Sequence, residues 1–175
     1  MEYSRARFLV SAGLGAGAVV LLDRLVARAA TIEASDVATL NAAIELERAG
    51  IKAYTDAAAT KLLSPKILQV ALLFQRDHQT HLAALVAAVQ SSGAVPSAKT
   101  AKLDYPNMTT ENEVLAFART VEETAASTYL SVIPEFKDRE LAGVAGSILG
   151  VETVHVGILA QALDAFPPYP GGFVK

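Results

Sequence analysis

The spacing between helix-forming segments is the feature that most limits what this chain can fold into. Four segments of helical periodicity follow one another, and the first pair and the last pair are each joined by about five residues. Connections this short produce antiparallel helical hairpins. The middle connection, from Ser91 to Met108, has 18 residues and contains Pro96 and Pro106. Because it can carry the chain from one end of a bundle to the other, the sequence predicts an all-α four-helix bundle of two antiparallel hairpins joined by one long crossover.

Residues that favour helix ends mark the limits of the four predicted helices. The predicted caps are Ser35 and Asp36 for the first helix, Ser64 followed by Pro65 for the second, Thr110 with Glu113 for the third, and Asp138 for the fourth. The predicted helix ends lie near Ala59, near Val89, before Pro134 and near Ala165. The prolines and glycines of residues 167–175 then exclude a helix from the tail.

Composition excludes several other classes of protein. Of the 175 residues, 33 are alanine, and hydrophobic residues make up 52% against 19% charged. Such a chain is too apolar to be disordered, and alanine favours tightly packed helices. The absence of cysteine excludes a disulfide scaffold, thiolate zinc sites and iron–sulfur clusters. With a net charge of -3 there is no basic face, so we expect no nucleic-acid partner.

Residues 1–29 have the pattern of an export signal. Arg5 and Arg7 precede an uncharged, mostly apolar run of 15 residues, which is short for a membrane span. Ala27-Arg28-Ala29 then supplies the small residues of a cleavage site. The two arginines resemble the pair of a twin-arginine signal, although one residue separates them. We therefore expect a protein exported to the periplasm or cell envelope, with its bundle at residues 30–166. The alternative is that residues 1–29 stay uncleaved as an N-terminal anchor. We expect the protein to contact a membrane only through such an anchor.

The inward face of each predicted helix is interrupted near its midpoint by ionisable side chains. These are Glu47 in the first helix, His78 and His81 in the second with Asp77 at the edge of the stripe, Glu122 in the third, and Glu152 and His155 in the fourth. Burying a lone carboxylate is costly, and no lysine or arginine lies on these stripes to act as a counter-ion. Histidine pairing could neutralise part of the charge, whereas a bound cation accounts for all four interruptions together.

The two halves of the chain repeat one pattern. A glutamate is followed by a tyrosine seven residues later and by a histidine 34 or 33 residues later: Glu47, Tyr54 and His81 in the first half, and Glu122, Tyr129 and His155 in the second. Each predicted hairpin therefore offers a carboxylate from its first helix and an imidazole from its second. Glu152 and His155 also form a Glu-x-x-His pair, whose i,i+3 spacing directs both side chains to one place.

Two stretches of the chain resemble the ferritin-like domain family that includes desiccation-related proteins. They are Leu40-Asn41-Ala42-Ala43-Ile44-Glu45-Leu46-Glu47, followed by Tyr54, and Ser147-Ile148-Leu149-Gly150-Val151-Glu152-Thr153-Val154-His155. The resemblance covers about residues 36–166. It implies a ferritin-like four-helix bundle that holds two Fe or Mn ions, with Glu47, His81, Glu122, Glu152 and His155 as ligands.

The chain departs from the family pattern at one position. The resemblance implies a glutamate three residues before His81, where it would bridge the two metals, but this chain has His78 there and Asp77 beside it. Either Asp77 replaces the missing carboxylate, or the site is asymmetric, or it holds one metal, or it has lost its metals. His78 is itself a candidate ligand. We expect Tyr54 and Tyr129 to fill the core and hydrogen-bond near the ligands rather than to take part in redox chemistry.

Carboxylate and imidazole ligands suit Fe(II) and Mn(II), and open coordination positions admit O₂ or peroxide. We therefore expect an exported metalloprotein that oxidises metal or detoxifies peroxide, with O₂ or peroxide as its substrate. The alternative is a non-enzymatic bundle with a degenerate or single-metal site, acting in envelope stress protection or in binding a partner. A third hypothesis, an iron-storage cage, requires a homo-oligomer.

Overall fold

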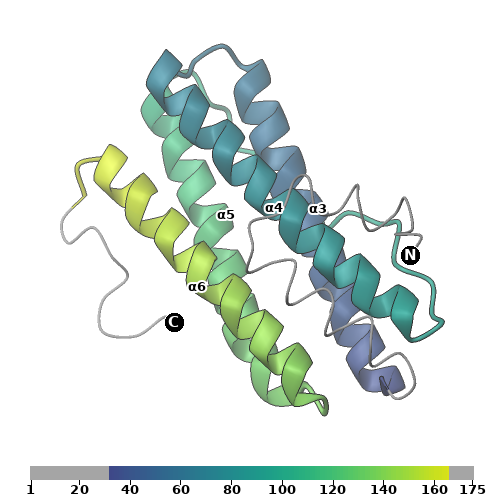
Figure 1. Cartoon of the computed structure of the whole chain (residues 1–175). Helices are drawn as coiled ribbons and strands as arrows, with labels where there is room; N and C mark the ends of the chain where they lie inside the picture. The colour runs from purple at the N-terminus through teal and green to yellow at the C-terminus, as the bar shows by residue number, and fades with distance from the viewer. Residues whose placement is uncertain (1–31, 166–175) are drawn as a thin grey trace, which may run out of the picture.

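The computed structural model describes residues 32–165 and confirms an all-α fold. Over that range the chain forms four long helices and one short 3₁₀ helix: α3 (Ala34–Ala59), α4 (Pro65–Ser91), α5 (Glu111–Val132), η1 (Ile133–Glu135) and α6 (Arg139–Ala162). Figure 1 shows the four long helices side by side in a bundle. The predicted export signal and the C-terminal tail lie outside the described residues, so both stay predictions.

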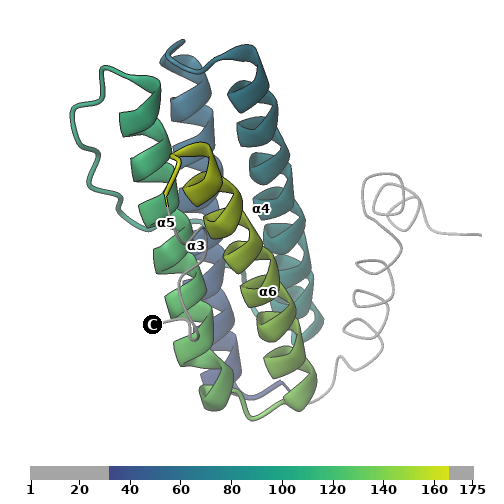
Figure 2. The ribbon, with the colours of Figure 1, turned by 90° about the vertical axis from the view of Figure 1, so that its left-hand side faces the viewer.

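The helices pair as the connection lengths predict. α3 packs mainly against α4 and α5 mainly against α6, while the main contact between the two hairpins is that of α3 with α5. The long crossover runs from α4 to α5 and contacts α3 on its way (Figure 2). There the Ser97 hydroxyl donates to Glu45 Oε1 at 2.6 Å, and the Ala101 amide donates to the Glu45 carbonyl at 3.0 Å. Glu45, on the polar side of α3, is therefore half-buried against the crossover.

Three of the four predicted caps are confirmed. Ser64 occupies the N-cap position of α4 with Pro65 in the first turn, although its side chain makes no capping hydrogen bond. Thr110 and Glu113 form a capping box at α5, and the Asp138 carboxylate accepts from the Glu140 amide at 2.8 Å. The last helix ends at Ala162, not near Ala165.

The cap predicted for the first helix is wrong. α3 begins at Ala34, after Glu33, so Asp36 already lies within its first turn. The buried Asp36 carboxylate instead accepts hydrogen bonds from the backbone amides of Lys137 and Asp138, both at 2.9 Å. It therefore attaches the turn between α5 and α6 to the start of α3, a contact between distant segments that a local sequence pattern does not contain.

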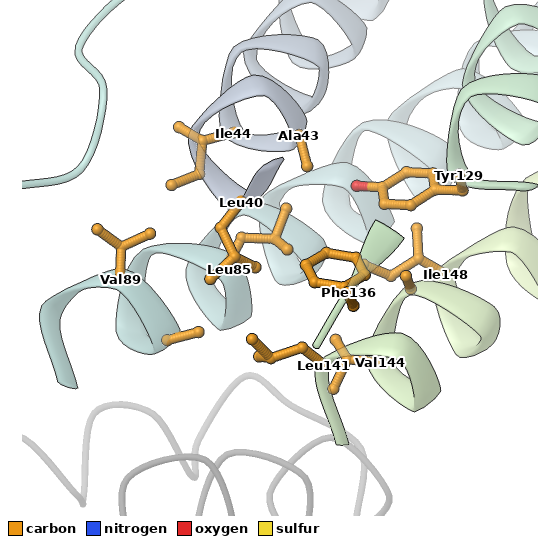
Figure 3. Close-up of a cluster of buried hydrophobic side chains, with 12 residues drawn as sticks. Leu40, Ala43, Ile44, Leu85, Val89, Tyr129, Phe136, Leu141, Val144 and Ile148 are labelled. Carbon is orange, nitrogen blue, oxygen red and sulfur yellow. The ribbon is translucent and has the colours of Figure 1, made fainter. Parts of the chain in front are cut away.

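Two apolar clusters fill the bundle, one toward each end. The larger contains Leu40, Ile44, Leu85, Val89, Tyr129, Phe136, Leu141 and Ile148, and Figure 3 shows its side chains converging from different helices. The smaller contains Tyr54, Ala71, Phe74, Leu115, Ala118 and Leu159. On each long helix the ionisable residues lie between the residues of these two clusters. The site is therefore enclosed in the middle of the bundle, where water is excluded and charges need partners.

Candidate metal centre

The structure brings all six inward-facing glutamates and histidines together. The ligand atoms of Glu47, His78, His81 and Glu152 lie within 4.8 Å of one another, and so do those of His78, Glu122, Glu152 and His155. We call these two sets the first and the second ligand group. All six residues are buried. The two groups share His78 and Glu152; apart from these, the first group takes Glu47 and His81 from the first hairpin, and the second takes Glu122 and His155 from the second.

Glu152 spans the two ligand groups. Its Oε1 lies 3.1 Å from His81 Nδ1 in the first group, and its Oε2 lies 3.3 Å from His155 Nδ1 in the second. Neither oxygen of Glu152 has a hydrogen-bond partner, and neither does His81 Nδ1. Leaving buried polar atoms without partners is unfavourable by about 1–3 kcal/mol each. Oxygen and nitrogen donors that face one another in this way fit a pair of cations, with the Glu152 carboxylate between them.

His78 also lies between the two ligand groups. Its Nδ1 is 2.7 Å from Glu47 Oε2, and its Nε2 is 3.3 Å from Glu122 Oε1. Only 2% of the residue is exposed. The sequence placed His78 on the inward stripe and left its role open; in the structure its ring lies inside the cluster, facing one glutamate of each hairpin.

The two tyrosines of the repeat hold the glutamates of the opposite hairpin. Tyr54 of α3 donates its hydroxyl hydrogen to Glu122 Oε1 of α5, and Tyr129 of α5 donates to Glu47 Oε1 of α3. Both tyrosines are buried, as expected for core residues with a polar contact. Each bond fixes one carboxylate oxygen: Glu47 Oε2 is left to face His78 and His81, whereas Glu122 Oε1 faces both Tyr54 and His78, and its Oε2 faces His155.

Asp77 belongs to neither ligand group. Its Oδ2 lies 3.2 Å from His155 Nε2, and its side chain is 35% exposed. The ring of Phe74 stacks on the His155 ring with 3.8 Å between centroids. Together they fix the imidazole so that Nδ1 faces Glu122 and Glu152, as carboxylates beside metal-binding histidines commonly do. Sequence reasoning missed this contact, although an acid next to the ligand stripe was the available signal.

Mutual pairing shifts the pKa values of the cluster. Burial opposes the charged imidazolium, but the close negative charges of Glu47, Glu122 and Glu152 outweigh it: the pKa values of His81 and His155 rise to about 9, and that of His78 rises well above its usual range.

The three glutamates respond to burial differently. Burial opposes the charge of Glu47, yet its hydrogen bond to His78 and the nearby His81 imidazole lower its pKa to about 2. The pKa of Glu122 is likewise well below its usual range, because His155 and His78 outweigh burial. For Glu152 burial dominates and raises the pKa. The carboxylate shared by both groups is thus the least well neutralised by the protein's own side chains.

An open groove between α4 and α6 reaches the second ligand group. It has a volume of about 290 Å³ and is lined by Leu73, Phe74, Asp77, Ser147, Gly150, Val151, Val154, His155 and Ile158. Most of this lining is apolar, and His155 and Asp77 bring polar atoms to it. The groove therefore offers small uncharged molecules a route toward the cluster from outside the bundle.

Comparison with known proteins agrees with the four-helix fold. A structure described as a conserved hypothetical protein from Mycobacterium tuberculosis matches with a TM-score of 0.67 at 19% identity, over 76% of this chain and 93% of that one. A second structure, described as ferritin-like, diiron-carboxylate proteins from Bacillus anthracis str. Ames, matches with a TM-score of 0.60 at 22% identity, over 82% of this chain and 97% of that one. No curated protein matches the sequence. The model of the ferritin-like domain matches residues 35–165, so the chain belongs to the ferritin-like domain family.

Proposed function

We propose that this protein binds two Fe or Mn ions in the Glu/His cluster and uses them to oxidise Fe(II) or to consume peroxide outside the cytosol. The position of Glu152 carries the proposal, because each of its unpartnered oxygens faces a different ligand group. The Bacillus anthracis structure, described as diiron-carboxylate, supports a pair of ions rather than one. When bound, the ions would supply the one-electron changes that oxidation or peroxide reduction needs.

The protein's own residues would bind the ions, hold the ligands in place and exclude water. Glu47 with His81 and Glu122 with His155 would bind one ion each, Glu152 would bridge them, and His78 would be the sixth ligand. Tyr54 and Tyr129 hold the terminal carboxylates by hydrogen bonds, which fixes the geometry before any ion arrives. The apolar clusters at both ends exclude bulk water, and the groove between α4 and α6 would admit O₂ or peroxide.

Elemental analysis of the purified chain tests the proposal. Protein produced in iron- or manganese-replete medium should contain close to two ions per chain, and peroxide added to it should disappear faster than with chelator-treated protein. Less than one ion per two chains contradicts metal binding as the function. Two bound ions without oxidation of Fe(II) or loss of peroxide contradict the proposed chemistry and leave the metal site intact.

A second candidate function is a non-enzymatic bundle with one ion or none, acting in envelope stress protection or in binding a partner. It is favoured by His78, since an imidazole stands where a fourth carboxylate would balance the charge of a second ion. Thermal unfolding with and without chelator separates the two candidates. A structural ion raises the melting temperature by mass action but supports no turnover.

Export and assembly are proposals on the sequence alone. Cleavage after residue 29 would appear as a mass difference between the cytosolic precursor and the protein recovered from the cell envelope. An uncleaved precursor in the membrane fraction would instead indicate an anchor. Gel filtration tests the cage, because a monomer or dimer excludes it.

A further inference from the structure

Among the positions at which the two halves of the bundle differ, two lie next to the ligands of the metal centre. Three residues after the first-helix glutamate, the first half has Gly50 where the second half has Ala125. Three residues before the second-helix histidine, the first half has His78 where the second half has Glu152. Gly50 is one turn from Glu47 on the buried face of α3 and is buried itself. Both differences therefore lie on the lining of the metal centre.

Gly50 and His78 are in direct contact. A Cβ atom on Gly50 would lie 2.8 Å from Nδ1 and Cε1 of the His78 ring and 2.9 Å from its Nε2. Side-chain carbons essentially never approach other atoms so closely, so any residue larger than glycine would displace the ring.

The ring has little freedom to move away. Glu47 and Glu122 hold its two nitrogens at 2.7 Å and 3.3 Å, and the His81 and His155 rings meet it edge-on at centroid distances of 6.0 Å and 5.9 Å. By contrast, a Cβ on Gly143 of α6 would meet nothing within 4 Å. Helix interiors normally disfavour glycine relative to alanine, so Gly50 has a specific steric reason to be there.

We infer that Gly50 is a positioning residue that makes room for the His78 ring, and that this pair sets the metal preference of the site. The inference rests on the proposed function, since it concerns the ions that the same cluster would bind. With His78 the six ligands are three imidazoles and three carboxylates, whereas a glutamate would make four carboxylates and two imidazoles. Imidazole suits Fe and Zn, and carboxylate suits Mn. The pair therefore biases the site toward Fe(II) and Zn(II) and away from Mn(II).

Four forms of the full chain test the inference: the wild type, Gly50→Ala, His78→Glu, and the double variant, which copies the second half's combination of Ala125 and Glu152. Dissociation constants for Fe(II), Zn(II) and Mn(II) are measured anaerobically by calorimetry. Gly50→Ala alone should weaken Fe(II) binding about tenfold or more. The double variant should regain tight binding, with the ratio of Mn(II) to Fe(II) dissociation constants several-fold lower than in the wild type.

Thermal unfolding of the metal-free chain gives a readout that does not depend on metal loading. Gly50→Ala should lower the melting temperature by several degrees when His78 is present, and should leave it unchanged or raise it in the His78→Glu background. Gly143→Ala is the matched control, since it adds the same methyl group to a helix with space around it. That control should leave metal binding unchanged and should not lower the melting temperature.

The possible failures are distinguishable. Wild-type protein that binds none of the three ions contradicts the proposed function, whatever the unfolding data show. If wild-type protein binds metal and Gly50→Ala binds it equally well with the same melting temperature, Gly50 makes no room for His78. If the double variant regains binding but keeps the wild-type metal ratio, the pair does not set the preference.

Discussion

Among individual residues, Glu152 gives the sharpest test of metal binding, because both of its oxygens are buried without a hydrogen-bond partner. We expect Glu152→Gln to abolish the binding of two ions, since an amide cannot bridge them as a carboxylate does. The melting temperature of the metal-free protein should stay the same or rise, because the variant removes a buried charge whose pKa burial already raises. Metal titration by calorimetry and thermal unfolding in chelator measure the two effects.

The control for this substitution is Glu123→Gln. Glu123 pairs with Arg119 on the surface of α5 at 2.8 Å, outside both ligand groups, so its loss should leave metal binding intact. Normal loading of two ions by Glu152→Gln would contradict the bridging role. A large fall in its metal-free stability would indicate instead that Glu152 has structural partners within the protein.

The raised histidine pKa values predict opposite pH dependences for stability and for metal binding. In the folded metal-free protein the pKa values of His81 and His155 rise from 6.5 to about 9. Their stabilisation is therefore complete below pH 6.5 and is lost as the pH rises through about 9. Metal ions require the neutral imidazoles, so binding should release protons and strengthen over the same interval.

Unfolding in chelator and metal titration, both measured from pH 6 to 9, test this pair of trends. The melting temperature should fall with rising pH while the metal affinity increases. Metal affinity that is independent of pH would mean that these histidines are already neutral or do not bind the ion.

Helical periodicity was sufficient to predict which side chains form the cluster, but not how they contact one another. Glu47, Glu122 and Glu152 could be placed inward because residues three and four apart share a helix face. The contact of Asp77 with His155 and that of Gly50 with His78 join different helices. Both contacts depend on how neighbouring helices pack and on ring orientations, which no single helix encodes.

At the scale of the helices, boundaries followed local chemistry except where a distant segment intervened. Ser64-Pro65 and the capping box of Thr110 and Glu113 act on their own helix, so the sequence sufficed to predict them. Asp36 has the residue type of a cap and lies close to the helix start, yet it binds the turn before α6. An acidic residue near a helix start favours a cap in isolation, and only the folded chain brings the competing amides to it.

Asp36→Ala should destabilise the bundle, because it removes a buried carboxylate that accepts hydrogen bonds from the partly buried backbone amides of Lys137 and Asp138. Loss of hydrogen bonds to a charged partner predicts a decrease of about 1.5–3 kcal/mol in the free energy of unfolding. Asp104→Ala, which removes an exposed partner of Lys102, should change it by less than about 1 kcal/mol. Urea unfolding of both variants measures the difference. Equal effects would mean that the Asp36 contact does not stabilise the turn.

For the whole molecule, the metal centre lies between the two hairpins, which have few other connections on the side of α4 and α6. Each hairpin packs closely within itself, and α3 with α5 forms the main contact between them. On the opposite side, α4 and α6 border the open groove. There the Nδ1 atoms of His81 and His155 each face one oxygen of Glu152, which lies between them. Bound ions would therefore connect the hairpins on the side where apolar packing does so least.

Metal removal should accordingly loosen α4 and α6 more than α3 and α5. An ion present at 100 times its dissociation constant stabilises the fold by about 2.7 kcal/mol, so chelator should lower the melting temperature measurably. Hydrogen exchange of the metal-free protein should speed up most near His81 and Glu152, and least in the apolar cluster around Leu40 and Ile44. Glu152→Gln should show the metal-free pattern even in the presence of metal. Exchange that is uniform along all four helices, or unchanged by chelator, would mean that the ions do not join the hairpins.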